Sequence, residues 1–380
     1  MAGALEGIRI IEFANYVSGP YAGMLLGDLG AEVIKVEEPT RGDPFRGWGR
    51  VEYSPTFGSV NRNKKSVTLD LKSETGKADA RALVTTADVV IENFRPGTME
   101  RLGLSHDSFA SQNPRLIWCS ITGYGNDGPY ALRPGYDTVG VATSGLLSLL
   151  TDIGDPKPMG ISLSDHLAGI TASNGIMAAL IARGRTGRGQ CVETSLLEST
   201  LSFCGENAAR FFENQKVPSR ATRTHQAQVY AFTAGDGKAF VIHLSSPAKF
   251  WKALVDVAGK PEWLEDPRFA TKETRGKHYD ALNHALSDIF RSDTRDFWLT
   301  QLQAADVPAA PLNTFDDVFS DPQVEHLKMR VEVSHPVLGS VGLVRNGLRL
   351  SDTPAEVRTC SPELGEHNEE ILTPLKQKIL

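Results

Sequence analysis

The first 120 residues alternate short runs of β-branched, apolar residues with segments of helical periodicity. Strands are predicted at Ile8–Phe13, Glu32–Val36, Ser66–Leu71, Asp88–Glu92 and Leu116–Ser120. Helices are predicted between them at Tyr21–Leu29 and Gly76–Thr85. This order requires parallel strands, because a crossover helix joins consecutive strands that run the same way. We therefore predict an α/β fold with a Rossmann-like large domain and a doubly wound parallel sheet.

The later part of the chain predicts a second, smaller domain, since 380 residues exceed one ordinary domain. A strand at Cys191–Thr194 and a helix from Leu196 to Asn214 lead to Lys216–Thr224, a polar stretch typical of a linker. Short strands and helical patterns follow at Tyr230–Leu244, Phe250–Val257, His278–Phe290 and Asp293–Ala304, and strands return at Val331–Val333 and Val341–Val344. We predict a large domain of residues 1–215 and 325–380, and a linker with a small α+β domain over residues 216–324.

Composition and motifs disfavour several classes of function. The net charge of −6 argues against nucleic-acid binding, which depends mainly on basic surface. The four cysteines are far apart and the nine histidines are scattered, so we expect neither a metal site nor a disulfide framework. No signal peptide and no long apolar run is found, which predicts a cytoplasmic protein without a membrane segment. The first turn, NYVSGPYAG, lacks GxGxxG and disfavours an NAD-dependent enzyme.

Asp165 stands at the start of a predicted helix that ends near Gly184 and is rich in small residues. These residues would let another backbone or a thin ligand approach closely; they are Ala168, Gly169, Ala172, Gly175, Ala178 and Ala179. Two interpretations stay open. Asp165, or Ser164 before it, is the N-cap of the helix, or Asp165 is a covalent nucleophile. For the second, we expect the helix N-terminus to keep the carboxylate ionised and to place amides near a developing oxyanion.

Three basic stretches are candidates for binding a phosphorylated ligand. They comprise Arg41, Arg46 and Arg50; Asn61–Lys65 together with Lys72; and Asn93–Gly97 together with Arg101. Each alone is typical of a solvated loop, but all lie near ends of predicted parallel strands, where open α/β sheets bind ligands. In the third stretch, Phe94 is suited to stack on a purine, and Arg95 and Arg101 are suited to bind phosphate.

The loop Tyr124–Asp137, YGNDGPYALRPGYD, is rich in glycine and proline and ends in Tyr136 and Asp137. This composition is typical of turns, in which Asp accepts backbone hydrogen bonds, and also of functional loops. The loop contains no histidine for an acid–base pair, and the GxSxG motif of serine hydrolases is absent from the chain. The residues of the loop leave both interpretations open.

Seven segments form an ordered set along the chain: LEGIRIIEFANYVSGPYAGMLLGDLGAEVIKVEEPTRGD, NRNKKSVTLDLKSETGK, VVIENFRPGTMERLGL, ITGYGNDGPYALRPGYD, RTGRGQ, VPAAPLNTFDDVFSDPQV and LGEHNEEIL. Together, and in this order, they resemble the class III CoA-transferases of CaiB/BaiF type. That family groups formyl-CoA and carnitine-related CoA-transferases with the 2-methylacyl-CoA racemases. The resemblance covers nearly the whole chain.

The resemblance implies that Asp165 attacks an acyl-CoA to give an aspartyl anhydride. The released CoA thiolate then forms an aspartyl-CoA thioester, from which an acceptor carboxylate collects CoA. CoA contacts are implied for Tyr16 and Val17 through their backbone, and for Leu69, Lys72, Asn93, Phe94, Arg95 and Arg101. Glu38 departs from the family pattern, since relatives often have a phosphate-facing arginine there, and we expect Arg41 to replace it. The family fold also implies an interlocked homodimer.

The pair Tyr136-Asp137 distinguishes between the activities of the family. The racemases that this chain resembles have a His-Asp pair there, whereas a tyrosine is normally protonated near neutral pH and is a poor base. We therefore expect a CoA-transferase that acts on carboxylic acids, with Tyr136 and Asp137 orienting the site. The alternatives are a 2-methylacyl-CoA racemase and a non-catalytic CoA-binding protein.

The acceptor acid is not fixed by these motifs. A dicarboxylic acid such as succinate would need a group that binds its second carboxylate. Candidates for that group are Arg41, Arg46, Arg50 and His166, which are equally suited to be surface or CoA-facing residues.

Overall fold

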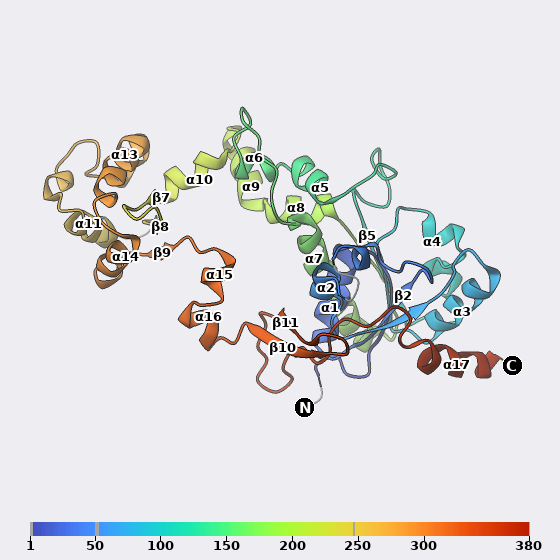
Figure 1. The fold of residues 1–380 in the computed structure, drawn as a ribbon. Helices are drawn as coiled ribbons and strands as arrows, with labels where there is room; N and C mark the ends of the chain where they lie inside the picture. Colours follow the sequence, from blue (N-terminus) through green and yellow to red (C-terminus); the bar gives the residue numbers. More distant parts are fainter. Residues whose placement is uncertain (1–2, 50–52, 246–247, 380) are drawn as a thin grey trace. The chain divides into compact units, whose positions relative to one another are not determined.

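The computed structural model describes residues 3–49, 53–245 and 248–379 (Figure 1). The chain divides into two compact units, each discontinuous in sequence. The large unit comprises Met1–Leu147, Pro158–Glu206 and Pro322–Leu380, and the small unit comprises Ser148–Lys157 and Asn207–Asp321. This division differs from the predicted borders at residues 216 and 325 chiefly because Ser148–Lys157 belongs to the small unit.

The large unit is built on a six-stranded, all-parallel sheet in the order β3-β2-β1-β4-β5-β6. The strands are β1 (Arg9–Phe13), β2 (Glu32–Glu37), β3 (Lys64–Thr68), β4 (Val89–Glu92), β5 (Ile117–Thr122) and β6 (Cys191–Ser195). Every residue of β4 and β5 is buried, as expected for central strands covered on both faces. The predicted doubly wound parallel sheet is confirmed.

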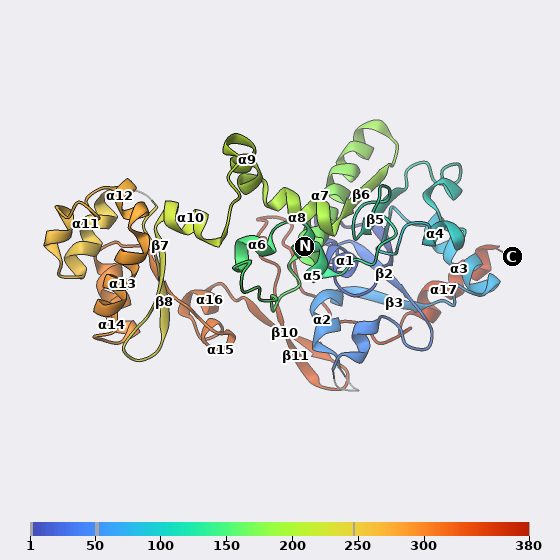
Figure 2. The same ribbon diagram turned by 90° about the horizontal axis from the view of Figure 1, so that it is seen from above.

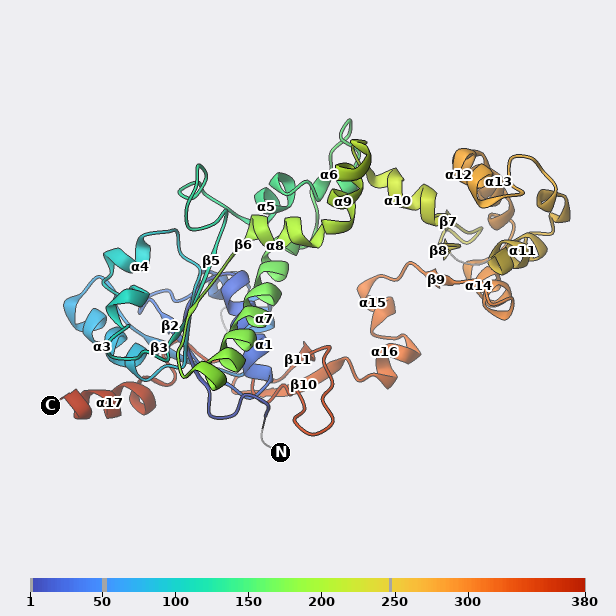
Figure 3. The same ribbon diagram turned by 180° about the vertical axis from the view of Figure 1, so that it is seen from behind.

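Helices cover both faces of this sheet. Those that lie wholly in the large unit are α1 (Ser18–Asp28), α2 (Pro55–Asn61), α3 (Glu74–Thr85), α4 (Thr98–Arg101), α5 (Asp137–Thr143), α7 (Leu163–Thr186), α8 (Leu196–Phe203), α16 (Pro322–His326) and α17 (Asn368–Ile379). Helices α1 and α7 lie side by side on one face, with Leu26 and Ile176 in a shared core (Figure 3). Helices α3 and α17 cover the other face through Leu83 and Leu372.

The small residues of α7 permit the close backbone approach that the sequence predicts. A Cβ atom added at Gly169 would lie 2.8 Å from the backbone oxygen of Ser18 in α1. The helix ends at Thr186, and Gly187 follows in the left-handed region with a φ of 73°. Helix α7 is therefore held firmly against α1 along its first half.

The small unit contains a three-stranded antiparallel sheet, β7 (Val229–Thr233), β8 (Ala239–His243) and β9 (Ala309–Pro311). Its helices include α10 (Arg220–Ala227), α11 (Ala248–Val257), α12 (Lys272–Lys277), α13 (Tyr279–Phe290), α14 (Arg295–Ala304) and α15 (Phe315–Val318). Figure 2 shows α11, α13 and α14 grouped beside β7 and β8, where Phe240, Leu282 and Leu302 are fully buried. The predicted hairpin and three helices are confirmed.

Several elements differ from the sequence prediction. The helix predicted from Leu196 to Asn214 breaks at Cys204, and α9 (Gly205–Asn214) begins at the glycine that follows. The predicted linker at Lys216–Thr224 overlaps α10. The strand predicted at Ser66–Leu71 begins two residues earlier, at Lys64. Helices α2, α5 and α6 (Leu147–Leu150) were not predicted, because each is too short to show a helical period.

The C-terminal segment, Pro322–Leu380, belongs to the large unit. An antiparallel hairpin, β10 (Arg330–His335) and β11 (Gly339–Val344), precedes α17. The side chain of Asn368 accepts the backbone N–H of Thr68 at 2.8 Å, which ties the start of α17 to the end of β3.

Strand order reverses between β1 and β4, which are neighbours at the centre of the sheet. Phe13, the last residue of β1, pairs with Glu92, the last residue of β4. The loops that leave these two strands therefore begin side by side at the carboxyl edge of the sheet. In open α/β folds this switch point is the place where ligands bind.

The described part of the chain contains no helix that is both long and apolar enough to span a bilayer. Among the same residues, no three His, Cys, Asp or Glu side chains are grouped so as to hold a metal ion.

Candidate functional site

A cavity of about 230 Å³ lies at the carboxyl edge of β1, β4 and β5. Its lining residues are Asn15, Tyr16, Ser18, Asn93, Phe94, Arg95, Pro96, Ile121, Thr122, Gly123, Ala131, Arg133, Gly135, Tyr136, Asp165 and Leu196. The fold thus brings together six residues that the sequence analysis named: Tyr16, Asn93, Phe94, Arg95, Tyr136 and Asp165.

Asp165 is the third residue of α7, which begins at Leu163. Ser162 occupies the N-cap position, but its side chain makes no capping hydrogen bond. The cap is supplied by Asp137, whose Oδ1 accepts the backbone N–H of Ser164 at 2.7 Å and that of Asp165 at 3.2 Å. The N-cap interpretation of Asp165 and Ser164 is therefore wrong, and the Asp165 carboxylate lines the cavity instead.

Burial, and then the nearby carboxylate of Asp137, raise the pKa of Asp165 from the ordinary 3.8 to about 7. From sequence, we expected the helix N-terminus to keep this carboxylate ionised. Desolvation and a like charge outweigh that favourable dipole, because both penalise the charged form. A half-buried carboxylate with so raised a pKa, placed in a cavity, is typical of a functional group.

Tyr16 forms the turn that follows β1. Its φ of 63° lies in the left-handed region, which costs a non-glycine residue about 1–3 kcal/mol. The N–H of Tyr16 donates to Asp43 Oδ1 at 3.3 Å, and its ring makes edge contacts with Phe45 and Tyr136. Burial raises the pKa of Tyr16, and the charge and hydrogen bond of Tyr136 add to the shift. The turn is thus held in a strained form with its ring against Tyr136.

A buried network of charges lies behind this turn. The Lys35 ammonium lies 2.9 Å from Asp43 Oδ2 and 3.1 Å from Glu12 Oε1, and it donates to the backbone oxygen of Ala14 at 2.6 Å. Lys64 donates to both oxygens of Glu12, at 3.0 and 2.8 Å. Burial lowers the pKa of Lys64 to about 8, although Glu12 opposes the shift. The network fixes Asp43, and through it the turn of Tyr16.

Asn93 joins the loops that leave β1 and β4. Its Oδ1 accepts the N–H of Asn15 at 2.9 Å, and its Nδ2 donates to the backbone oxygen of Asn15 at 2.7 Å and to Ser18 Oγ at 3.2 Å. Glu92, one residue earlier, accepts the N–H of Phe94 at 2.9 Å. Burial raises the pKa of Glu92 to about 7. Both side chains therefore hold the Phe94 loop in place.

The second basic stretch, Asn61–Lys65, does not line the cavity of Asp165. It lies at the amino end of β3 rather than at the carboxyl edge, since the strand begins at Lys64. Arg62 pairs with Asp28 at 2.7 Å, and Lys65 pairs with Glu32 at 3.0 Å. Together with Lys64, these cations neutralise carboxylates within the large unit.

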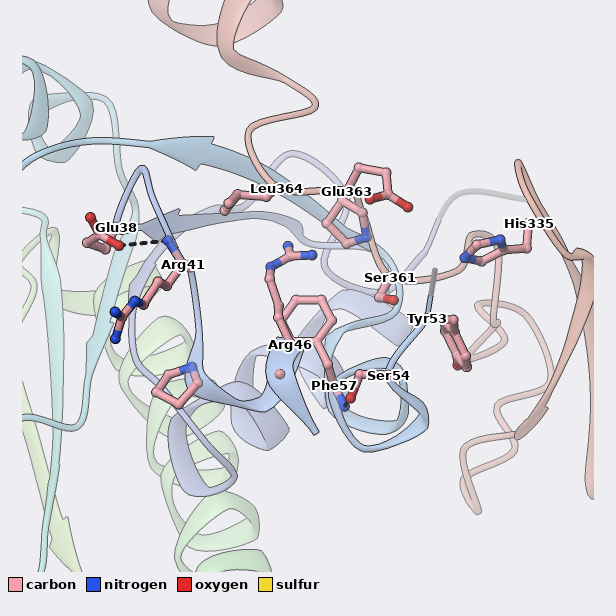
Figure 4. Close-up of a pocket in the computed structure, with 14 residues that line it drawn as sticks. Glu38, Arg41, Arg46, Tyr53, Ser54, Phe57, His335, Ser361, Glu363 and Leu364 are labelled. Carbon is pink, nitrogen blue, oxygen red and sulfur yellow. Dashed lines mark hydrogen bonds between the residues drawn. The ribbon is translucent and has the colours of Figure 1, made fainter. Parts of the chain in front are cut away.

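The first basic stretch lines a different cavity of about 770 Å³, which Figure 4 shows. Arg46 pairs with Glu37 at 2.7 Å and lies over the ring of Phe57. Arg41 also lines this cavity, and its backbone N–H donates to Glu38 Oε2 at 2.8 Å (Figure 4). Neither arginine lines the cavity of Asp165. Arg50 lies outside the described residues.

Four other predicted CoA contacts do not line the Asp165 cavity: Val17, Leu69, Lys72 and Arg101. Val17 and Leu69 are buried, whereas the Lys72 and Arg101 side chains are exposed. His166 packs edge-on against Tyr21, with its Nδ1 2.5 Å from the backbone oxygen of Ser162. Arg41, Arg46 and His166, three of the four residues proposed from sequence for a second carboxylate, do not line the cavity of Asp165.

Sequence reasoning missed one cation that does line the cavity of Asp165. Arg133 lines the cavity and belongs to the Tyr124–Asp137 loop, in which only Tyr136 and Asp137 were predicted as site residues. Its guanidinium lies over the ring of Tyr130, 3.7 Å from the centroid. An arginine three residues before Tyr136 was the available sequence feature, but nothing in the local pattern showed which way it faces.

The chain is similar to known proteins in both sequence and structure. The model of CoA-transferase family III matches residues 5–368. The chain is 36% identical to succinyl-CoA:glutarate CoA-transferase of Mus musculus, over 97% of this chain and 85% of that protein. It is 35% identical to succinyl-CoA–D-citramalate CoA-transferase of Chloroflexus aurantiacus, over 98% and 94% of the two chains. A crystal structure of a CaiB/BaiF family protein from Brucella suis superposes with a TM-score of 0.89 at 34% identity, covering 99% of this chain and 100% of that chain.

Proposed function

The chain belongs to CoA-transferase family III and is an enzyme that transfers coenzyme A, and we propose that it does so through a covalent bond to Asp165. The observation that carries the proposal is the position of this carboxylate. It lines the cavity at the switch point of the sheet, on the first turn of a firmly packed helix, and takes no part in the cap. Asp137 makes the cap, so Asp165 is left available to react.

The proposed reaction begins when an Asp165 oxygen attacks the thioester carbonyl of the donor. The C–S bond breaks, CoA leaves as a thiolate, and the acyl group remains on Asp165 as a mixed anhydride. The thiolate then attacks the aspartyl carbonyl and releases the donor acid, which leaves an aspartyl-CoA thioester. The acceptor carboxylate attacks this thioester to give a second anhydride and a thiolate. Attack of that thiolate on the acceptor acyl carbon forms the product and restores the Asp165 carboxylate.

The raised pKa of Asp165 suits this chemistry. A carboxylate that has lost part of its hydration shell is more nucleophilic than one in water, provided that enough of it is ionised. With a pKa of about 7, a substantial fraction of Asp165 is ionised near neutral pH. Tyr136 and Asp137 orient the site, Tyr136 by its contact with Tyr16 and Asp137 by holding the first turn of α7.

We propose that CoA binds to residues at the carboxyl edge of the parallel sheet. Tyr16, Asn93, Phe94 and Arg95 line the cavity, which supports their assignment to the reactive end of the molecule. Arg101 and Lys72, whose side chains are exposed, are assigned to the phosphates. Val17, Leu69 and Arg41 complete the proposed binding surface. Arg41 is proposed to take the role of the arginine that relatives often have at the position of Glu38.

The acids that exchange CoA are proposed to be short dicarboxylic acids. The relatives named above act on succinyl-CoA with glutarate or D-citramalate. The cavity volume of about 230 Å³ lies below the range of about 300–1,000 Å³ for drug-sized ligands, which fits a short acyl group.

The test is a matrix of donors and acceptors. Succinyl-CoA, glutaryl-CoA, acetyl-CoA and butyryl-CoA are each incubated with succinate, glutarate, malate, citramalate, acetate and butyrate, and new thioesters are identified by mass spectrometry. We expect exchange among the dicarboxylates, and loss of all exchange in Asp165→Asn. A wild-type enzyme that forms no new thioester with any pair contradicts the proposed reaction.

The working molecule is proposed to be an interlocked homodimer. In support, α8 exposes Leu201 and Phe203, at 48% and 61% of their full surface, which is unusual for large apolar residues close together. Light scattering coupled to gel filtration is expected to give twice the 41.3 kDa of one chain. A monomer that retains full activity contradicts this assembly.

A further inference from the structure

We propose that Arg133 binds the distal carboxylate of the dicarboxylic acid and so determines which acids the enzyme accepts. This inference rests on the proposed function, because it assigns a specificity residue to the same cavity. It names a residue other than the candidates from sequence, which were Arg41, Arg46, Arg50 and His166.

The fold places Arg133 at the cavity through a pinned loop. Gly123 and Gly135 close the two ends of the Tyr124–Pro134 segment so tightly that a Cβ at Gly135 would lie 2.8 Å from the Cα of Gly123. Both glycines line the cavity, as do Arg133 and Asp165. The start of the loop is tied down by Thr122, whose hydroxyl accepts the N–H of Gly125 at 2.9 Å. A short segment with fixed ends therefore carries the arginine to the wall of the cavity.

The guanidinium is oriented and also free to bind an anion. Its central carbon lies over Tyr130, 3.7 Å from the ring centroid, and Tyr130 in turn makes an edge contact with Tyr124. A guanidinium held over an aromatic ring by a cation–π contact still has N–H groups available for hydrogen bonds. No ion pair to Arg133 is found among the described residues, in contrast to Arg46, which Glu37 neutralises. A planar, unpaired guanidinium is the group that binds a carboxylate through two parallel hydrogen bonds.

A second arginine, Arg95, also lines the cavity but belongs to a different loop. Arg95 directly follows Phe94 in the loop after β4, the segment assigned to CoA, whereas Arg133 belongs to the loop after β5. The two cations therefore reach the cavity from different loops, so Arg95 can bind CoA while Arg133 binds the distal carboxylate of the acid. A monocarboxylate would leave Arg133 unpaired and gain nothing from it.

The experiment compares Arg133→Gln, Arg133→Lys and Tyr130→Ala with wild type in the succinyl-CoA and glutarate reaction. Arg188→Gln, at an exposed arginine in the turn after α7, is the matched control. The KM for glutarate and the Kd for free CoA are both measured. We expect Arg133→Gln to raise the KM for glutarate about 100-fold, the size of loss seen when a hydrogen-bonded charge partner is removed, with the Kd for CoA unchanged.

The other variants separate charge from geometry. Arg133→Lys is expected to recover only part of the affinity, because an ammonium cannot form the paired hydrogen bonds. Tyr130→Ala is expected to fall between wild type and Arg133→Gln. An unchanged KM for glutarate, or a Kd for CoA that rises to the same extent, overturns the assignment of Arg133. Exchange by wild type that involves only monocarboxylates also overturns it while leaving CoA transfer intact, whereas the absence of any exchange refutes the proposed function itself.

Discussion

Asp137 Oδ1 accepts the backbone N–H of Asp165 at 3.2 Å, so one carboxylate caps the helix turn that carries another. The same residue also accepts the N–H and the hydroxyl of Ser164. Two consequences follow from this geometry. The position of Asp165 depends on the cap, and the pKa of Asp165 depends partly on the negative charge of the cap.

Two substitutions distinguish the cap that Asp137 provides for α7 from the effect of its negative charge on Asp165. Asp137→Asn keeps an oxygen that can accept the N–H groups of α7 but removes the charge, so we expect nearly unchanged stability and a lower pKa of Asp165. Asp137→Ala removes the cap as well and is expected to lower the free energy of unfolding by about 1 kcal/mol. Urea denaturation measures the stability, and Asp127→Asn in the exposed part of the loop is the control. Equal destabilisation by both substitutions contradicts the separation.

The rate of CoA transfer is expected to depend on pH through Asp165. Only the ionised carboxylate is a nucleophile, and burial followed by the Asp137 charge raises its pKa to about 7. With an acyl-CoA donor that does not titrate between pH 5 and 9, kcat/KM should rise tenfold per pH unit below about 7 and level off above it. In Asp137→Asn the rising limb should move to lower pH. A profile that is flat from pH 5 to 8 contradicts the raised pKa.

Glu92 is expected to make stability fall as pH rises. Burial raises its pKa from 4.5 to about 7 in the folded protein, so the folded state holds its proton more tightly than the unfolded state. The stabilisation is complete below about pH 4 and is lost as pH rises through about 7. Glu92→Gln keeps an oxygen for the N–H of Phe94 without the charge. We expect it to raise Tm at pH 8 and to leave Tm nearly unchanged at pH 4; a lower Tm at pH 8 contradicts this.

Asp43 is expected to be important for both folding and substrate binding. Asp43→Ala leaves the buried Lys35 ammonium with one carboxylate fewer and removes an acceptor from the strained turn of Tyr16. Breaking a buried ion pair costs about 3–5 kcal/mol, so a clear fall in unfolding free energy is expected. The KM for acyl-CoA should also rise because Tyr16 lines the cavity. Asp352→Ala, at an exposed position, is the control. If Asp43→Ala changes stability and KM no more than Asp352→Ala does, the proposed role of Asp43 is refuted.

Much of the fold was predictable because strands and helices of the sheet are local patterns. The apolar runs ending at Phe13 and Glu92 predicted two strands, which the structure pairs with each other at the centre of the sheet. The roles of the charged residues were harder to predict from the sequence. Lys64 belonged to a candidate phosphate-binding stretch, whereas its partner in the structure is Glu12, 52 positions away in sequence. The capping of α7 by Asp137 likewise links residues 28 positions apart, and the direction in which Arg133 faces depends on the closure of its loop. Contacts of this kind are set by packing and leave no periodic trace in the sequence.

The most direct test of the account is to trap the covalent intermediate on Asp165. The enzyme is incubated with succinyl-CoA, without an acceptor acid, and treated with hydroxylamine or borohydride before digestion and mass spectrometry. We expect the peptide that contains Asp165 to carry the hydroxamate or the reduced residue, and the same peptide of Asp165→Asn to carry neither. Wild-type enzyme that exchanges CoA at its full rate while Asp165 stays unmodified, or with the label on another carboxylate, would contradict the account.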